Sequence, residues 1–171
     1  MERKNIITFK GNPLTLVGSE VKVGDIAPDF TACDANLQPV RLSNFKGQTV
    51  ILSAVPSLDT PVCEIQTKKF NQEAAALNAK VLTISLDLPF AQKRFCDAFK
   101  IQNVTVLSDY KDKDFANKYG LLIKELALIS RAVIVVGANG KISHFEIVKE
   151  VTQEPNYKAA FDKVKTAVGI S

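Results

Sequence analysis

The feature that most constrains the fold is a near-continuous apolar run of β-forming residues at positions 49–55. A strand that is apolar on both faces must be covered on both faces, as happens at the centre of an α/β sheet. Similar runs follow at 81–86, 104–107 and 132–136. Because the intervening segments include stretches with apolar residues at helical spacing, the pattern predicts one α/β domain with a central mixed sheet flanked by helices.

The remaining elements follow from turn and helix-start signals. Helices are expected over 61–77, from Pro89 through Phe99, over 112–119 and over 155–168. Two strands at 6–9 and 14–17 flank Gly-Asn-Pro and predict an N-terminal hairpin. Short strands are expected at 30–33 and 40–42, followed by a turn at 43–46. A second hairpin is expected to pair 132–136 with 141–146. Periodicity alone also allows a flavodoxin-like sheet. That fold needs a glycine-rich phosphate loop, and the loop at 56–60 has no glycine.

Composition excludes several classes of protein. The net charge is only +4, and its lysines are interspersed with acids, which gives no footprint for nucleic acid. No apolar run is long enough to cross a membrane, and no signal peptide is visible at the start, so the expected location is the cytoplasm. With three cysteines, one histidine and no CxxC pair, neither a disulfide scaffold nor a structural zinc or iron–sulfur site is expected.

The loop between the first buried strand and the next helix holds the most informative residues. Thr60 suits an N-cap and Pro61 a first helical position, which places Cys63 in the first turn. There it lies near unsatisfied backbone N–H groups and the positive end of the helix dipole. This position favours a thiolate, which is the nucleophilic form of cysteine.

The helix end alone cannot ionise a thiol. An ordinary cysteine has a pKa of about 8.5, and lowering it to around 6 requires roughly 3.4 kcal/mol. A helix terminus supplies only about 0.3–1 kcal/mol, so a cation is needed as well. The candidates are Arg3, Arg41, Arg94 and Arg131, of which Arg131 is preferred because it begins the buried 132–136 strand. The residues alone leave open that Cys63 is an inert buried thiol beside Val62 and Ile65.

Residues 56–63 fit the pattern Pro-x3-Thr-x2-Cys of the peroxiredoxins, with Pro56, Thr60 and Cys63 at its fixed positions. Further segments, at 23–30, 87–96, 130–133 and 154–157, resemble those of the bacterial thiol peroxidases, the atypical 2-Cys peroxiredoxins. The similarity extends over essentially the whole chain.

The resemblance implies a thioredoxin-like fold with an N-terminal β-hairpin, residues 1–171 forming a single domain, and a homodimer. It implies that Cys63 is the peroxidatic cysteine and Cys96 the resolving one, joined in an intrachain disulfide during turnover. Thr60 and Arg131 would bind the peroxide and the thiolate, and Pro56 would shield the pocket. The substrates would be hydrogen peroxide and organic hydroperoxides, thioredoxin would be the reductant, and the role would be antioxidant defence. The resemblance also implies that no cofactor or metal is bound.

Three residues outside the matched loop also carry expectations: Cys96, Cys33 and His144. Cys63 and Cys96 lie on different predicted helices, so closing a disulfide should require local unfolding around both residues. Cys33 matches no catalytic position and is expected to be structural, and His144 is expected to face solvent. Two other classes stay open on the residues alone: a thiol–disulfide exchange protein, although CxxC is missing, and a domain with inert thiols.

Overall fold

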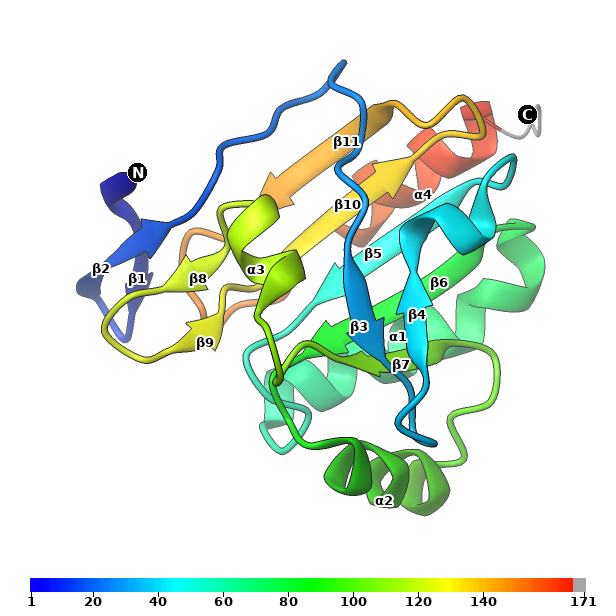
Figure 1. Cartoon of the computed structure of the whole chain (residues 1–171), viewed down its shortest axis with the longest axis horizontal. Helices are drawn as coiled ribbons and strands as arrows, with labels where there is room; N and C mark the ends of the chain where they lie inside the picture. The colour runs from blue at the N-terminus through cyan, green and yellow to red at the C-terminus, as the bar shows by residue number, and fades with distance from the viewer. Residues whose placement is uncertain (168–171) are drawn as a thin grey trace.

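The computed structural model describes residues 1–167, which form two sheets and the helices around them (Figure 1). The larger sheet has the order β11-β10-β5-β6-β7-β3-β4. Its strands are β11 (Ile142–Ile147), β10 (Ala132–Val136), β5 (Val50–Ala54), β6 (Lys80–Ser85), β7 (Thr105–Ser108), β3 (Thr31–Cys33) and β4 (Pro39–Arg41). β5, β6 and β7 are parallel and the other pairs are antiparallel, which confirms the mixed sheet. The antiparallel β10 rules out the flavodoxin-like alternative.

The N-terminal hairpin is confirmed and belongs to a second, smaller sheet. β1 (Glu2–Phe9) pairs with β2 (Asn12–Val17), and the sheet continues with β8 (Leu122–Ile123) and β9 (Leu128–Ile129). β8 and β9 were not predicted from the sequence, because two-residue strands are too short to show a periodic pattern. Figure 1 shows this sheet beside one end of the larger one.

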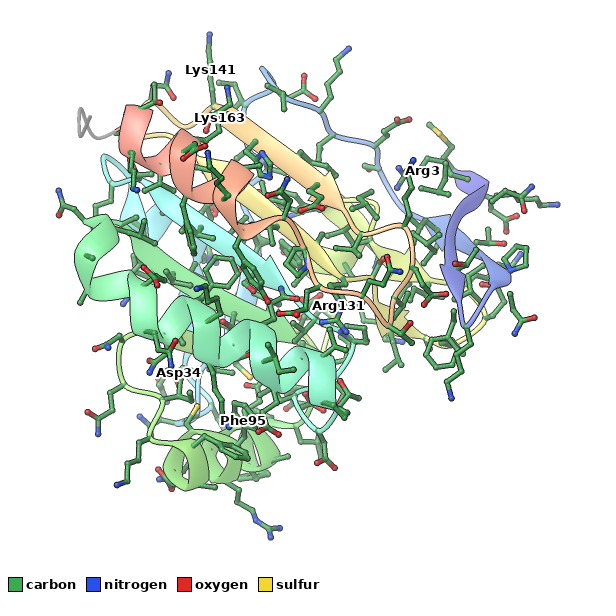
Figure 2. All side chains as sticks on the ribbon, turned by 180° about the vertical axis from the view of Figure 1, so that it is seen from behind. Arg3, Asp34, Phe95, Arg131, Lys141 and Lys163 are labelled. Atoms are coloured by element: carbon green, nitrogen blue, oxygen red, sulfur yellow. The ribbon has the colours of Figure 1, made fainter. Side chains whose placement is uncertain are left out.

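Helices cover both faces of the larger sheet. α1 (Pro61–Leu77) and α4 (Tyr157–Ala167) lie on one face, and the short α3 (Asp114–Lys118) lies on the other, while α2 (Pro89–Phe99) lies beside β7 (Figures 1 and 2). The side chains of β10 alternate between the two faces: Val133 and Val135 pack with α1 and α4, and Ile134 packs with α3. Both faces are therefore apolar, as the strand composition predicts.

The predicted boundaries differ from the observed ones mainly at chain turns. The third helix is shorter than the predicted 112–119, and residues 42–45 form a 3₁₀ helix where a turn was expected over 43–46. The last predicted helix residue, Val168, lies outside the described residues. No helix within residues 1–167 combines the length and apolar character needed to cross a bilayer.

The register of the central strands determines where the site forms. Ala54, at the end of β5, pairs with Ala132 at the start of antiparallel β10, and with Ile84 near the end of parallel β6. Three segments therefore meet at one edge of the sheet: the loop that leads from β5 to Cys63, the residue that precedes β10, and the loop that follows β6.

Candidate active site

Cys63 lies in the first turn of α1 and its side chain is fully buried. Thr60 is the N-cap and Pro61 begins the helix, as predicted, and the first intrahelical bond runs from the Glu64 amide to the Thr60 carbonyl (2.9 Å). The Cys63 amide therefore belongs to the unsatisfied N–H groups at the positive end of the helix. The sulfur is a free thiol, set in the apolar cluster between the sheet and α1.

The structure places the Arg131 guanidinium against this sulfur. Arg131 Nη2 donates to Cys63 Sγ at 3.2 Å, Nη1 donates to Gln66 Oε1 at 3.0 Å, and Nε donates to the Val151 carbonyl at 2.9 Å. Arg131 is only 2% exposed. Gln66 is held in turn, because its Nε2 donates to Ser53 Oγ at 2.8 Å. A planar guanidinium with a bond on each nitrogen has one orientation, and it points at the sulfur.

The charge balance of this cluster is unusual. Among the residues that the structure describes, no carboxylate lies within ion-pair distance of Arg131. A buried cation without a counter-ion is costly, and a negative charge beside it lowers that cost. The sulfur of Cys63 is the group in hydrogen-bond contact with the guanidinium that can become an anion. An anion formed at this position would therefore lie directly against the guanidinium.

Thr60 and Pro56 border the same loop. Pro56 is buried in the loop after β5, separated from the strand by Val55. Thr60 occupies the N-cap position, but its side chain makes no capping bond; its hydroxyl instead donates to the Ser57 carbonyl at 3.1 Å. Because the hydroxyl proton is used there, the oxygen lone pairs of Thr60 remain able to accept a hydrogen bond.

Asp87, which sequence reasoning missed, fastens this loop to the segment that carries the second cysteine. Its carboxylate accepts hydrogen bonds from Ser57 Oγ (2.7 Å), the Leu58 amide (2.8 Å) and Ser85 Oγ (2.6 Å). Ser85 Oγ also accepts from Gln92 Nε2 of α2 at 3.0 Å. One carboxylate thus links the Cys63 loop, the end of β6 and α2.

Cys96 lies in the last turn of α2, as a half-buried free thiol that packs against the cluster containing Cys63. Burial raises the pKa of the Cys96 thiol, and the neighbouring Asp97 adds to the rise. A cavity of about 350 Å³ separates α2 from the Cys63 loop, and it is lined by residues of both segments, among them Leu58, Asp59, Arg94 and Phe95. Figure 2 shows Phe95 on α2, facing the underside of α1.

The other residues singled out from the sequence lie outside this cluster. Cys33 is half-buried in β3 and pairs with Ser108 of β7, and burial raises the pKa of its thiol. The expectation that His144 faces solvent is wrong: the side chain is half-buried, its Nε2 is buried without a hydrogen-bond partner, and burial lowers its pKa. Arg3, Arg41 and Arg94 make no hydrogen bond to Cys63.

Gln66 and Ser53 also escaped sequence reasoning, although a signal was present. Gln66 follows Cys63 by three positions and so shares its buried helix face with the apolar residues Phe70 and Ala74. Ser53 interrupts the apolar run of β5. A polar residue on a buried face needs a partner, so these two residues could have been matched.

Comparisons with known proteins agree with this arrangement. The Redoxin family model matches residues 22–161. Thiol peroxidase from Halalkalibacterium halodurans is 50% identical over 163 residues, covering 95% of this chain and 98% of the relative. Thiol peroxidase from Bacillus subtilis shows the same identity and coverage. The crystal structure of a peroxiredoxin-like protein from Aquifex aeolicus superposes with a TM-score of 0.90 at 46% identity, covering 96% of this chain and 97% of that one.

A thioredoxin-like sheet with a buried cysteine at a helix start and an arginine on its sulfur defines a thiol-based redox enzyme. The chain belongs to the Redoxin family and, within it, to the thiol peroxidases of the peroxiredoxin class. Its activity is that of an antioxidant peroxidase.

Proposed function

We propose that the chain reduces hydrogen peroxide and organic hydroperoxides with Cys63 as the peroxidatic nucleophile, and that Cys96 resolves the oxidised intermediate within the same chain. The observation that carries the proposal is the 3.2 Å contact between the buried Arg131 guanidinium and Cys63 Sγ, in a cluster where no carboxylate pairs with Arg131.

The first step is an in-line attack of the Cys63 thiolate on one peroxide oxygen. The S–O bond forms as the O–O bond breaks, so that sulfur is oxidised to a sulfenic acid and the leaving oxygen departs as hydroxide or alkoxide, which takes up a proton. Arg131 and the N–H groups of the first helical turn stabilise the negative charge as it moves to the leaving oxygen. Thr60 Oγ1, whose proton is directed to Ser57, accepts the hydrogen bond of the peroxide O–H.

The second step joins the two cysteines. The Cys96 thiol attacks the sulfenic sulfur, water leaves, and the disulfide protects Cys63 from further oxidation. In this structure both sulfurs are free thiols, Cys63 at the start of α1 and Cys96 near the end of α2. A disulfide requires Cα atoms about 4.4–6.8 Å apart. We therefore expect the first turn of α1 and the last turns of α2 to loosen, and the cavity between them provides space for that movement.

The remaining parts of the cycle rest on the family resemblance. Thioredoxin returns two electrons to the Cys63–Cys96 disulfide and releases both thiols, and the enzyme works as a homodimer in the cytoplasm.

Mass spectrometry after one equivalent of hydrogen peroxide tests the assignment. Wild-type protein should lose two hydrogens and yield a peptide linking Cys63 to Cys96. The Cys96→Ser variant should instead gain one oxygen on Cys63, trapped as its sulfenic acid. Cys63→Ser should show neither product.

The Cys33→Ser variant is the matched control, because it removes the third free thiol and leaves the proposed pair intact. It should behave as wild type. A linked peptide that contains Cys33, or unchanged peroxide consumption by Cys63→Ser, would overturn the proposal.

A further inference from the structure

The Arg131 guanidinium is oriented by a main-chain carbonyl that belongs to no helix or strand. Arg131 Nε donates to Val151 O at 2.9 Å, and Val151 lies in the turn between β11 and α4. This hydrogen bond can fix the position of Arg131 only if the Val151 carbonyl is itself held in place. What fixes residues 149–152 therefore also fixes the angle at which Arg131 meets Cys63.

The N-terminal hairpin holds this segment through its main chain. The Thr8 amide of β1 donates to the Lys149 carbonyl at 2.7 Å, and the Val151 amide donates to the Thr8 carbonyl at 2.9 Å. Thr8 thus brackets Glu150 in a short parallel bridge. The Val151 side chain is buried in the small core of the hairpin, with Ile7 and Leu14. Val151 therefore binds Arg131 on one side and the hairpin on the other.

The Glu150 carboxylate fastens the same junction from the side. Its Oε1 accepts from Thr8 Oγ1 at 3.0 Å and from the Gly11 amide, in the hairpin turn, at 2.9 Å. Its Oε2 accepts from the Thr152 amide at 2.8 Å and from Thr152 Oγ1 at 2.6 Å. These four bonds lower the pKa of Glu150 to about 2, the Thr152 hydroxyl contributing most, so the carboxylate stays charged throughout the working pH range.

We propose that the N-terminal hairpin is a positioning element of the active site, in which Glu150 and Thr8 fix the Val151 carbonyl that aims Arg131 at Cys63. The inference rests on the proposed function, since it assigns Glu150 to the orientation of the arginine used there. Figure 2 shows Arg131 between the start of α1 and the side of the molecule that carries the hairpin. Glu150 is a positioning residue and has no contact with the sulfur.

The decisive variant is Glu150→Gln. An amide offers one acceptor oxygen in place of two, so it cannot satisfy the donors on both sides of the junction. We expect the second-order rate constant for peroxide to fall about tenfold, which is less than the roughly 10²-fold that a full 1 Å displacement of a catalytic group can cost. Thr8→Val keeps the β-branched shape and removes only the hydroxyl, so it should lower the same rate constant by about two- to threefold.

Glu125→Gln is the matched control. Glu125 is an exposed glutamate whose two oxygens accept a hairpin amide, that of Thr15, and among the hydrogen bonds of the described residues it has none to residues 149–152. Its substitution should leave the peroxide rate within about twofold of wild type. Thermal unfolding of both variants separates a general loss of stability from the local effect.

A double-mutant cycle with Arg131→Met shows whether Glu150 acts through the arginine. Once Arg131 is removed, Glu150→Gln should cause no further loss. In a background lacking Cys33 and Cys96, Glu150→Gln should also move the pH profile of Cys63 alkylation by iodoacetamide to higher pH, which a purely structural role would not do.

The outcomes separate the two proposals. If Arg131→Met slows the reaction and Glu150→Gln does not, or if the two losses are fully additive, the hairpin inference is wrong and the proposed function stands. If neither Arg131→Met nor Cys63→Ser changes peroxide reduction, the proposed function itself fails.

Discussion

Cys63 and Cys96 have the same side chain but lie at opposite helix ends, Cys63 at the start of α1 and Cys96 near the end of α2. Cys63 lies in the first turn of α1, where the dipole is positive and a guanidinium contacts the sulfur. Cys96 lies in the last turn of α2, where its own carbonyl accepts the amides of Lys100 and Ile101 that close the helix. That end of a helix is negative and disfavours a thiolate. Under the proposed function, helix polarity and one buried cation distinguish Cys63, the nucleophile, from Cys96, its protonated partner.

Removing the Arg131 cation should have the largest effect on the difference in reactivity between Cys63 and Cys96. In the proposed mechanism Arg131 stabilises negative charge on the sulfur and on the leaving oxygen. Loss of one such donor costs about 10²–10³ in rate, so we expect Arg131→Met to slow the reaction by that factor. Stopped-flow measurement of the peroxide reaction checks this. Arg41→Met, an exposed arginine on the edge strand β4, should leave the rate unchanged. An Arg131→Met enzyme with the wild-type rate would show that the sulfur does not depend on this cation.

Loosening the link between the two cysteine segments should have the next largest effect. Asp87→Asn leaves one acceptor oxygen for three donors, so we expect about 1–2 kcal/mol less stability and roughly tenfold slower reaction with peroxide. Urea unfolding and peroxide kinetics measure the two effects. Asp97→Asn, an exposed carboxylate on α2 paired with Lys93, should change neither quantity appreciably.

The pH dependence of alkylation measures how reactive the Cys96 thiol is on its own. Burial raises the pKa of Cys96, so at neutral pH a smaller fraction is thiolate than in a free cysteine, and alkylation is slower. In a variant lacking Cys33 and Cys63, the iodoacetamide rate should keep increasing above pH 9 and fall several-fold short of a cysteine peptide at pH 7. A plateau below pH 8 would contradict the assignment of Cys96 as the protonated partner.

Cys33 should give the smallest effect. It lies on β3, next to the edge strand β4, and within the described residues it does not belong to the apolar cluster that contains Cys63 and Cys96. Cys33→Ala should change the peroxide rate by less than about twofold and the stability by less than about 1 kcal/mol. Kinetics and urea unfolding of this variant provide the baseline for the other substitutions.

The sequence predicted the order of elements well because each central strand and helix has its own local pattern. The first-turn position of Cys63 followed from Thr60 and Pro61 alone, and Arg131 was preferred because it precedes a buried strand. The bonds of Gln66 and Val151 to Arg131 could not be predicted, since they depend on the register that sets Ala54 beside Ala132. The hydrogen bond from the Leu58 amide to the Asp87 carboxylate could not be predicted for the same reason, since it depends on the parallel pairing of β5 with β6.

The full burial of Cys63 and Arg131 has a consequence for how the enzyme responds to its medium. Dissolved ions cannot come between the two groups, so the stabilisation that we propose Arg131 gives to negative charge on the sulfur is hardly screened. Charges at the surface, in contrast, are screened within about 8 Å at physiological ionic strength. The reaction with a small uncharged peroxide should therefore proceed at nearly the same rate in dilute buffer and in strong salt. The association rate of a charged protein that docks on the surface to return electrons should, in contrast, depend strongly on salt concentration.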